Sequence, residues 1–271
     1  MARAPKLKVV ARAGIGFDNV VLTDATSLGI AICNTPDGPT ISTAEHALAL
    51  ILSVSKDLNE SQGRLRRQEG NYGLQHRAIE LDGASLALIG LGRIGSRVAQ
   101  FAVAMGMRVT AYDPFEAAER FEDLGVERAS NLHDAVSSAH IVSIHAPLTP
   151  ETRHLVDAEL FSQMQDGVLI VNTARGGLID DHALLAALNS GKVAGAGLDV
   201  TEPEPLPSGH PLLDHQRVVV TPHVASATNE GRKRIFGMAL EQILCALGGI
   251  KPSHILNPEV WPGRNSERVD T

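Results

Sequence analysis

The sequence predicts an α/β protein whose main part is a doubly wound parallel sheet, and three observations lead to this prediction. From Ser85 to Thr221, short aliphatic runs alternate with amphipathic stretches, which is the pattern of parallel strands joined by crossover helices. Aromatic residues make up only 3% of the chain, whereas glycine is abundant, with 25 residues, so we expect aliphatic cores and frequent turns. The length of 271 residues allows one large or two ordinary domains.

The expected elements follow the apolar runs in order. Before Ser85, the sequence predicts strands at 7–11 and 30–33 and a long apolar helix at 42–60, with Ser42 or Thr43 as its N-cap. The stretch 61–83 is polar and rich in basic residues, so we expect a loop there, and the polar stretch 257–271 is expected to fray. Beyond Ser85 we predict strands at 86–89, 108–112, 141–144, 168–172, 194–198 and 217–221, and helices at 94–105, 116–124, 132–139, 158–164, 181–190 and 228–247.

Charge and hydropathy exclude several classes of partner. Lys and Arg number 24 against 31 Asp and Glu, and this net charge of −7 argues against nucleic acid or an anionic membrane. No apolar run reaches the roughly 18 residues of a membrane-spanning helix, and the first residues lack the apolar core of a signal peptide. Cys33 and Cys245 lie among aliphatic residues and are expected to be buried free thiols. We therefore expect a cytoplasmic protein.

A glycine-rich motif predicts a dinucleotide site. The run LALIGLGRIG contains Gly90, Gly92 and Gly95 in the spacing GxGxxG, between an expected strand and an expected helix. Gly90 permits the tight turn, Gly92 lets the backbone approach a pyrophosphate, and Gly95 lets the helix pack closely on the strand. The helix N-terminus, with Arg93 and Ile94 in its turn, then offers N–H donors and positive potential to the phosphates.

An acidic residue favours NAD over NADP. Asp113 ends the next expected strand, 18 residues after Gly95, and an acid near this spacing accepts hydrogen bonds from the ribose hydroxyls and repels a 2′-phosphate. No arginine follows it directly, since the next residues are Pro114, Phe115 and Glu116. A glycine turn beside an ordinary surface aspartate is the alternative, but the strand, the spacing and the acid agree on a dinucleotide site.

Three polar residues follow strands of the same expected sheet. Arg175 lies in the run NTARGG, Glu204 among the prolines of TEPEPLP, and His223 just past a strand in TPHVASAT. Each alone is an ordinary surface residue, but the carboxyl ends of parallel strands meet at one edge, where ligands bind. An arginine offers a bidentate fork to a carboxylate, and a histidine beside a carboxylate can exchange a proton near neutral pH. This combination is what a dehydrogenase needs.

The segments around these residues resemble the D-isomer-specific 2-hydroxyacid dehydrogenases, especially the phosphoglycerate dehydrogenase branch. The resemblance implies a Rossmann-type NAD domain beside a flavodoxin-like substrate lobe. A hydrolase of the S-adenosylhomocysteine type, which has a similar cofactor domain, is an alternative interpretation. The TARGG and TPH segments argue against it, because they belong to the hydroxyacid enzymes. The matching segments cover nearly the whole chain: ARAGIGFDNV (11–20), NTPDG (34–38), AEH (44–46), LIGLGRIG (88–95), HAPLTPETRHLV (145–156), NTARGGLID (172–180), GLDVTEPEPLP (197–207) and TPHVASAT (221–228).

The resemblance also implies roles for individual residues. His223 is the general acid and base, Glu204 is its partner, with Glu202 as the nearby alternative, and Arg175 orients the 2-keto acid. The implied substrate contacts are Arg12, the backbone N–H groups of Ala13 and Gly14, and Arg175. The implied cofactor contacts are Ile15, Gly90, Gly92, Arg93, Ile94, Gly95, Asp113, Ala146, Thr173, Ala174, Arg175, Asp199, His223 and Ala225.

The domain organisation departs from that of the family. We expect a partial substrate lobe at 1–37, an NAD-binding domain at 38–227, and a closing helix and tail at 228–271 that return to the substrate lobe. Family members carry two or three more strand–helix units before the segment that matches Lys6–Ala11, so the lobe is expected to be incomplete, with exposed apolar edges. Pro39 replaces an amide found in some phosphoglycerate dehydrogenases, and Ala225 replaces the usual glycine.

Two functional hypotheses follow. The first is an NAD-dependent dehydrogenase of a D-2-hydroxy acid, with 3-phosphoglycerate or the hydroxypyruvate and glyoxylate pair as substrates. The second is a truncated, catalytically impaired module of the same family that only binds NAD or dimerises. Arg12, His76 and Arg77 are the basic residues that could meet a phosphate, although the last two are expected to be solvated. The resemblance further implies a homodimer formed through the NAD domain, mainly by the helix at 42–60 and the basic segment after it.

Overall fold

The computed structural model describes Met1 and residues 3–261. The chain divides into two compact units. We call Thr43–Ala225 the sheet unit, and Met1–Ser42 together with the segment from Ser226 onward the terminal unit. The expected domain limits at 37/38 and 227/228 lie within a few residues of these boundaries.

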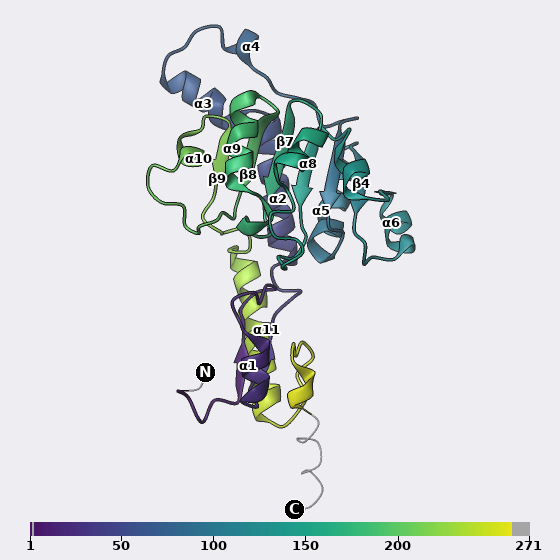
Figure 1. Ribbon diagram of the computed structural model, residues 1–271, viewed down its shortest axis with the longest axis vertical. Helices are drawn as coiled ribbons and strands as arrows, with labels where there is room; N and C mark the ends of the chain where they lie inside the picture. The colour runs from purple at the N-terminus through teal and green to yellow at the C-terminus, as the bar shows by residue number, and fades with distance from the viewer. Residues whose placement is uncertain (2, 262–271) are drawn as a thin grey trace, which may run out of the picture. The chain divides into compact units, whose positions relative to one another are not determined.

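The sheet unit is built on a seven-stranded parallel sheet in the order β5-β4-β3-β6-β7-β8-β9 (Figure 1). Within this sheet, β3 comes first along the chain and β4 and β5 follow outward on one side of it. The chain then returns to the other side of β3, where β6 pairs with it. This doubly wound parallel sheet confirms the predicted fold class, and its order reverses between β3 and β6. The strands are β3 (Ser85–Ile89), β4 (Arg108–Tyr112), β5 (Glu127–Arg128), β6 (Ile141–Ile144), β7 (Val168–Asn172), β8 (Val193–Leu198) and β9 (Val218–Val220).

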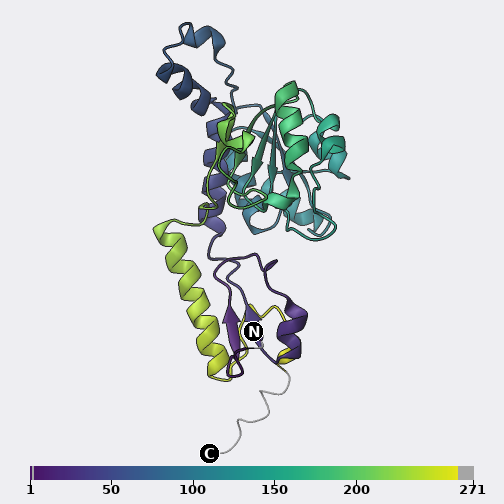
Figure 2. The ribbon, with the colours of Figure 1, turned by 60° about the vertical axis from the view of Figure 1, so that its left-hand side comes forward.

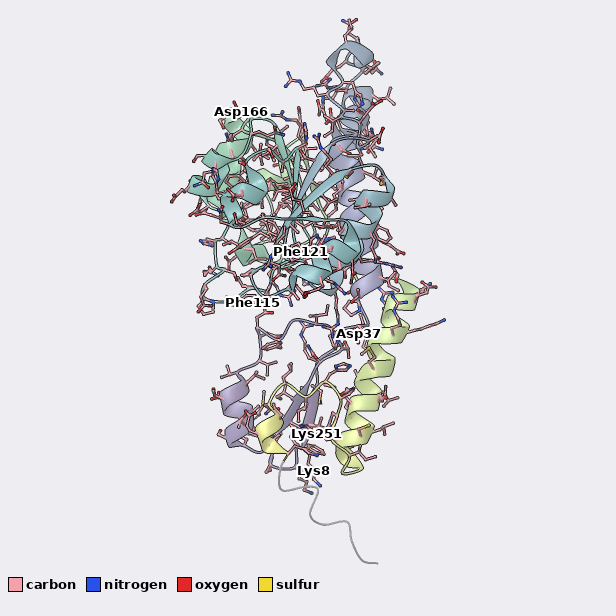
Figure 3. The ribbon with its side chains drawn as sticks, turned by 90° about the vertical axis from the view of Figure 1, so that its right-hand side faces the viewer. Lys8, Asp37, Phe115, Phe121, Asp166 and Lys251 are labelled. Carbon is pink, nitrogen blue, oxygen red and sulfur yellow. The ribbon has the colours of Figure 1, made fainter. Side chains whose placement is uncertain are left out.

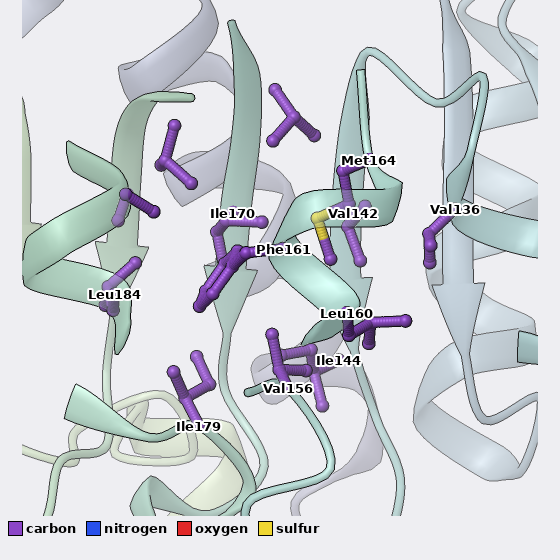
Figure 4. Packing of buried hydrophobic residues seen from close by; sticks show 14 of the residues in the cluster. Val136, Val142, Ile144, Val156, Leu160, Phe161, Met164, Ile170, Ile179 and Leu184 are labelled. Carbon is purple, nitrogen blue, oxygen red and sulfur yellow. The ribbon is translucent and has the colours of Figure 1, made fainter. Parts of the chain in front are cut away.

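Helices cover both faces of this sheet, so its strands are nearly continuous apolar runs. Along β3, Ala87 and Ile89 face one core, whereas Leu86 and Leu88 face the other. The first core contains Phe161, which lies among aliphatic side chains of the neighbouring elements (Figure 4). The helices of this unit are α3 (Leu58–Arg66), α4 (Tyr72–Gln75), α5 (Arg93–Ala104), α6 (Ala118–Leu124), α7 (Leu132–Val136), α8 (Ala158–Gln163), η1 (Gly176–Leu178), α9 (Asp181–Ser190) and α10 (Pro211–Asp214), together with most of α2 (Thr40–Ser55).

The two phenylalanines that flank the start of α6 differ sharply in burial. Phe121 is buried in the second core, where the Arg128 guanidinium lies 5.2 Å from its ring centroid. Phe115 follows β4 and is 94% exposed, and Figure 3 shows it at the periphery of the sheet unit. The loop after β4 therefore leaves the sheet with an apolar side chain in solvent, two residues after Asp113.

The terminal unit contains the short parallel pair β1 (Val9–Ala11) and β2 (Ala31–Cys33). Helix α11 (Asn229–Leu247) lies on one side of the two strands and α1 (Leu22–Ser27) on the other (Figure 2). Two small apolar cores result: one includes the single tryptophan, Trp261, and the other is centred on Ile30 and Ile32 of the β2 region. Cys33 is buried and Cys245 half-buried, both as free thiols, and burial raises the pKa of Cys33 to about 11.

Several predicted element boundaries were wrong. The helix expected at 42–60 ends at Ser55, because Asp57 adopts a left-handed backbone with φ 51° and a new helix, α3, begins at Leu58. The expected loop at 61–83 contains the rest of α3 and all of α4. Its end is fastened by the Ile79 amide, which donates to Ser55 O at 2.9 Å. The short elements α1, β5 and α10 were not predicted, since their apolar periods are too brief to detect.

The prediction that the chain frays from residue 257 was wrong for residues 257–261, while residues 262–271 lie outside the described part. Asn257 is 1% exposed and acts as a polar staple in the terminal unit. Its Oδ1 accepts from the Ile32 amide at 2.8 Å, and its Nδ2 donates to Ile30 O at 2.9 Å and to Thr26 Oγ1 at 3.1 Å. The short helix η2 (Pro258–Val260) follows, and Trp261 is buried.

We predict that Asn257→Ala lowers the free energy of unfolding of the terminal unit by about 2–4 kcal/mol, because the buried Ile32 amide and Ile30 carbonyl would lose their partner. Urea unfolding followed by the fluorescence of Trp261, the single tryptophan, reports this unit selectively. Asn229→Ala, at an exposed position at the start of α11, is the matched control and should change stability by less than about 0.5 kcal/mol. Equal midpoints for the two variants would contradict the role of Asn257.

Candidate active site

The glycine-rich turn between β3 and α5 has the geometry that the motif predicts. Gly90 has φ +97°, and a Cβ there would lie 2.9 Å from Ala146 N and from His145 C, at the end of the neighbouring strand β6. A Cβ on Gly95 would lie 2.2 Å from Gly90 O, so the helix could not approach the turn. A Cβ on Gly92 would instead meet open space. The turn is thus closed toward the protein and open where a phosphate would approach the start of α5.

A neutral histidine, His145, lies next to this turn, and its backbone packs against Gly90. His145 follows β6, and Ser143 Oγ lies 2.9 Å from its Nε2. Burial lowers its pKa to about 4, so the ring is uncharged at neutral pH. Sequence reasoning placed the next residue, Ala146, at the cofactor but gave His145 no role. The position of His145 next to Gly90 could have been inferred only from the order of the strands in the sheet.

Asp113 lies beside the glycine turn, as its spacing predicts, and also holds the turn in place. Its Oδ2 accepts from the Leu91 amide at 2.8 Å, and its Oδ1 accepts from the Phe115 amide at 3.0 Å. The carboxylate therefore links the end of β4 to the turn after β3. An acid beside the glycine turn is the arrangement expected for a ribose-binding residue.

The loop after β7 carries Arg175 and is shaped by Asn172. The Asn172 side chain is fully buried; its Oδ1 accepts from the Ala174 amide at 2.9 Å and its Nδ2 donates to Arg175 O at 2.8 Å. Arg175 is half-buried and donates from Nη1 to Ala174 O at 2.7 Å. Asn172 shapes the loop that carries Arg175, whereas sequence reasoning recorded it only as the end of a strand.

The hydroxyl of Thr173, in the same loop, fits a bound cofactor. Its Oγ1 is buried and has no hydrogen-bond partner within the described part of the chain. A buried hydroxyl without a partner is costly, so a ligand group that reaches it would gain a hydrogen bond. Together with the open face of Gly92, this hydroxyl makes the residues at this edge of the sheet fit a dinucleotide.

The loops after β7, β8 and β9 bring the three predicted catalytic residues to one edge of the sheet. Glu204 Oε1 lies 2.5 Å from His223 Nδ1, and both side chains are about two-fifths exposed. Glu202, the alternative partner, instead contacts Arg153 and His154. Arg175 reaches the same edge because the Gly176 backbone packs on Thr201: a Cβ at Gly176 would lie 2.1 Å from Thr201 C.

Asp199 fixes the loop that carries His223. It is 1% exposed, and its backbone O accepts from the His223 amide at 2.8 Å. Its carboxylate accepts from Thr221 Oγ1 at 2.6 Å and from the Val224 and Ala225 amides, each at 2.9 Å. Within this frame, His223 takes a left-handed backbone conformation with φ 52°.

The histidine of the AEH segment completes this network. His46 Nε2, on α2, lies 3.4 Å from Asp199 Oδ1 and 3.0 Å from Thr221 Oγ1. Burial raises the pKa of Asp199, but the hydrogen bonds from His46, Thr221 and the two amides outweigh it and hold the pKa below its ordinary value. Asp199 is therefore ionised at neutral pH. Sequence reasoning assigned this residue only a cofactor contact and gave His46 no role.

The remaining predicted substrate and cofactor residues lie in the terminal unit. Arg12, Ala13, Gly14 and Ile15 follow β1 in a turn that the residues after β2 hold. Thr35 Oγ1 accepts from the Gly14 amide at 2.8 Å, and Asn34 Nδ2 donates to Ile15 O at 2.8 Å. The Gly14 amide, which the resemblance assigned to the substrate carboxylate, is thus directed at Thr35 here. Arg12 Nη1 donates to Ala13 O at 3.1 Å.

The chain is similar to proteins of one family. Residues 48–225 match the model of the D-isomer specific 2-hydroxyacid dehydrogenase, NAD binding domain. The chain is 40% identical to a D-3-phosphoglycerate dehydrogenase of Methanocaldococcus jannaschii over 94% of its own length and 48% of the relative's, and 41% identical to a glyoxylate reductase of Aeropyrum pernix over 96% and 79%. The crystal structure of a D-lactate dehydrogenase from Aquifex aeolicus, complexed with NAD and lactic acid, superimposes with a TM-score of 0.86 at 31% identity, covering 94% of this chain and 82% of that one.

The chain therefore belongs to the D-isomer specific 2-hydroxyacid dehydrogenase family, and its sheet unit is the NAD-binding domain. It spans about half the length of the phosphoglycerate dehydrogenases that it matches. Within the described residues, no helix is long and apolar enough to cross a membrane, and His, Cys, Asp and Glu form no group suited to a metal ion.

We predict that Asp199→Asn destabilises the sheet unit at neutral pH, because an amide cannot accept all the hydrogen bonds that the carboxylate accepts. Since the pKa of Asp199 is lowered in the folded state, its stabilisation is present above the ordinary carboxyl range and is lost as the pH falls through the folded pKa. The difference between the variant and the parent in urea unfolding, followed by far-UV circular dichroism, should therefore shrink below about pH 4. Asp166→Asn, at a 91% exposed side chain, is the control; a pH-independent difference for Asp199→Asn would contradict this account.

Proposed function

We propose that this chain catalyses NAD-dependent hydride transfer at C2 of a D-2-hydroxy acid and the corresponding 2-keto acid. The observation that carries the proposal is the Glu204–His223 pair, 2.5 Å apart, on the edge of the sheet that also presents Arg175 and the glycine turn. The Nδ1 atom of His223 contacts Glu204, so the other ring nitrogen of His223, Nε2, is left to face a substrate. This is the arrangement of a general acid and base with a carboxylate partner.

The chain's own residues would divide the work as follows. In the oxidative direction His223 Nε2 removes the proton of the substrate hydroxyl, and Glu204 stabilises the imidazolium that forms. In the reductive direction the same nitrogen returns the proton to the oxygen of the keto group. The Arg175 guanidinium binds the substrate carboxylate and polarises the carbonyl. NAD, when bound, supplies the nicotinamide carbon that accepts or gives the hydride.

We infer that the cofactor is held by the residues that surround the glycine turn and the loops after β6, β7, β8 and β9. The closed and open sides of the turn, the position of Asp113 and the partnerless Thr173 hydroxyl support this assignment. The substrate contacts Arg12, Ala13 and Gly14 stay predictions. The proposed cofactor contacts in the sheet unit are Gly90, Gly92, Arg93, Ile94, Gly95, Asp113, Ala146, Thr173, Ala174, Arg175, Asp199, His223 and Ala225. Ile15, in the terminal unit, stays a prediction.

Two substrate classes deserve testing first. The similarity to D-3-phosphoglycerate dehydrogenases favours 3-phosphohydroxypyruvate in the reductive direction. The similarity to a glyoxylate reductase, of which the chain covers 79%, favours glyoxylate and hydroxypyruvate. Both classes present a carboxylate next to the reacting carbonyl, which is the group that Arg175 would bind.

The test is NADH oxidation in the presence of hydroxypyruvate, glyoxylate or 3-phosphohydroxypyruvate. We expect turnover of at least one of them, with NADH preferred over NADPH because of Asp113. His223→Gln should lower kcat by about 10²–10⁴-fold, the usual contribution of a general acid, and Arg175→Ala should raise the KM for the keto acid as well as lower kcat. Asp166→Asn should leave both constants unchanged. Binding of NADH without reduction of any keto acid above the His223→Gln level would refute the proposal.

We also propose that the chain forms a homodimer through the sheet unit. Helices α3 and α4 stand away from the sheet layers (Figure 2) and carry the exposed apolar side chains Leu58, Leu65, Tyr72 and Leu74, of which Leu74 is 90% exposed. Such a patch on one side of a protein indicates a contact surface. A second copy of the chain would cover it.

We predict that replacing Leu65 and Leu74 together by lysine converts this dimer to a monomer, because two buried charges without partners would oppose association. Light scattering coupled to gel filtration measures the mass directly. Leu213→Lys, at an exposed leucine on α10, is the control and should remain dimeric. A parent protein that is monomeric at every accessible concentration would remove the proposal.

A further inference from the structure

Glu202, two residues before Glu204, makes a set of contacts that the proposed reaction does not use. Its Oε1 accepts from Arg153 Nη1 at 3.0 Å and its Oε2 accepts from Arg153 Nη2 at 2.9 Å. His154 Nε2 lies 3.4 Å from the same Oε2. The paired contact with Arg153 is the bidentate arrangement, which fixes direction as well as distance.

The backbone of Arg153 is held within its own segment, and that of His154 is fastened to the loop that carries Arg175. The Arg153 amide donates to Thr149 O at 3.0 Å, and the His154 amide donates to Gly177 O at 2.8 Å. His154 adopts a left-handed backbone with φ 53°, and its ring contacts Glu202. The basic pair is thus tied, through His154, to Gly177, two residues after Arg175.

The loop Thr201–Pro205, which presents Glu204, is held by two contacts besides those of the Glu202 side chain. Thr201 Oγ1 donates to Pro203 O at 2.9 Å. On the other side, Gly176 leaves so little room that a Cβ would lie 2.7 Å from Glu202 N. Glu202 is therefore the side chain that connects this loop to Arg153 and His154, and Glu204 is the side chain that connects it to His223.

We propose that Glu202 is a positioning residue, and that its ion pair with Arg153, supported by His154, holds the loop so that Glu204 stays against His223. The inference rests on the proposed function, because it gives Glu202 a part in setting the rate of the same proton transfer. It divides the two glutamates of the TEPEP run: Glu204 contacts the general acid and base, and Glu202 fixes the backbone from which Glu204 projects.

The exposure of these side chains separates positioning from stability. Arg153 is 51% exposed and Glu202 40%, and an ion pair this exposed adds little to the stability of a fold. A displacement of about 1 Å in a catalytic group, however, can cost about 100-fold in rate. Loss of Glu202 should therefore slow the reaction while leaving unfolding almost unchanged.

The kinetic test compares Glu202→Ala, Arg153→Ala and the double variant in the full chain. We expect each to lower kcat by about 10-fold with little change in the KM for NADH or in the melting temperature. The double variant should be no slower than either single variant, because both remove the same contact. Arg153→Lys should recover part of the rate, since lysine keeps the charge but not the fork. Asp166→Asn, which breaks the Lys192–Asp166 pair elsewhere on the sheet unit, should behave as the parent.

A second readout follows the hydrogen bond itself. In the proton NMR spectrum, the His223 Nδ1 proton should give a downfield resonance, identified by its loss in His223→Gln. We expect it to persist in Asp166→Asn and to broaden or vanish in Glu202→Ala and Arg153→Ala. An unchanged resonance, an unchanged kcat, or a fall in kcat matched by loss of NADH binding and of stability each overturns the positioning role. If the parent chain reduces no keto acid, the proposed function fails, and the resonance alone still decides whether Glu202 positions Glu204.

Discussion

The buried carboxylate of Asp199 is the interaction on which the candidate active site depends. An ionised carboxylate is tolerated inside a protein only when its oxygens are hydrogen-bonded, and here Thr221, His46 and the amides of Val224 and Ala225 supply those bonds. The same bonds fix the backbone on both sides of His223. The left-handed conformation of His223, which costs of order 1–3 kcal/mol for a residue other than glycine, is held by this frame. The same hydrogen bonds thus stabilise the charge of Asp199 and position His223.

Close backbone approaches extend this frame along the edge of the parallel sheet. Gly90 lies against Ala146, which joins the loops after β3 and β6, and Gly176 lies against Thr201, which joins the loops after β7 and β8. A side chain at either glycine would push two neighbouring loops apart. Because these loops carry the dinucleotide turn and the catalytic residues respectively, the tolerance for substitution is set by packing between loops rather than by the conformation of each loop alone.

Much of this arrangement could be predicted from the sequence, because it depends on local patterns. All strands of the sheet except β5 follow from short, mainly aliphatic runs, and the GxGxxG turn follows from its spacing. The roles of Asn172, His145 and His46 could not be predicted in this way. Each acts on a partner brought near by strand order or by the position of α2, and a single sequence does not encode that proximity in any local period. The break between α2 and α3 at Asp57 was missed for a related reason: the helical pattern of the sequence continues across Asp57.

The balance of exposed and buried charge explains how a partly solvated pair can be held in one geometry. The Glu204–His223 contact is about two-fifths exposed on each side, so water competes for both groups and the contact contributes little to its own persistence. The geometry must therefore come from the two backbones. That of His223 is set by buried Asp199, where the hydrogen bonds are strong because water is excluded. That of Glu204 lacks a buried anchor of this kind and depends on Gly176 and on the Glu202–Arg153 pair. The loop that carries Glu204 is consequently held less firmly than the loop that carries His223. Substitutions around the Glu204 loop should therefore change the rate by displacing Glu204 rather than His223.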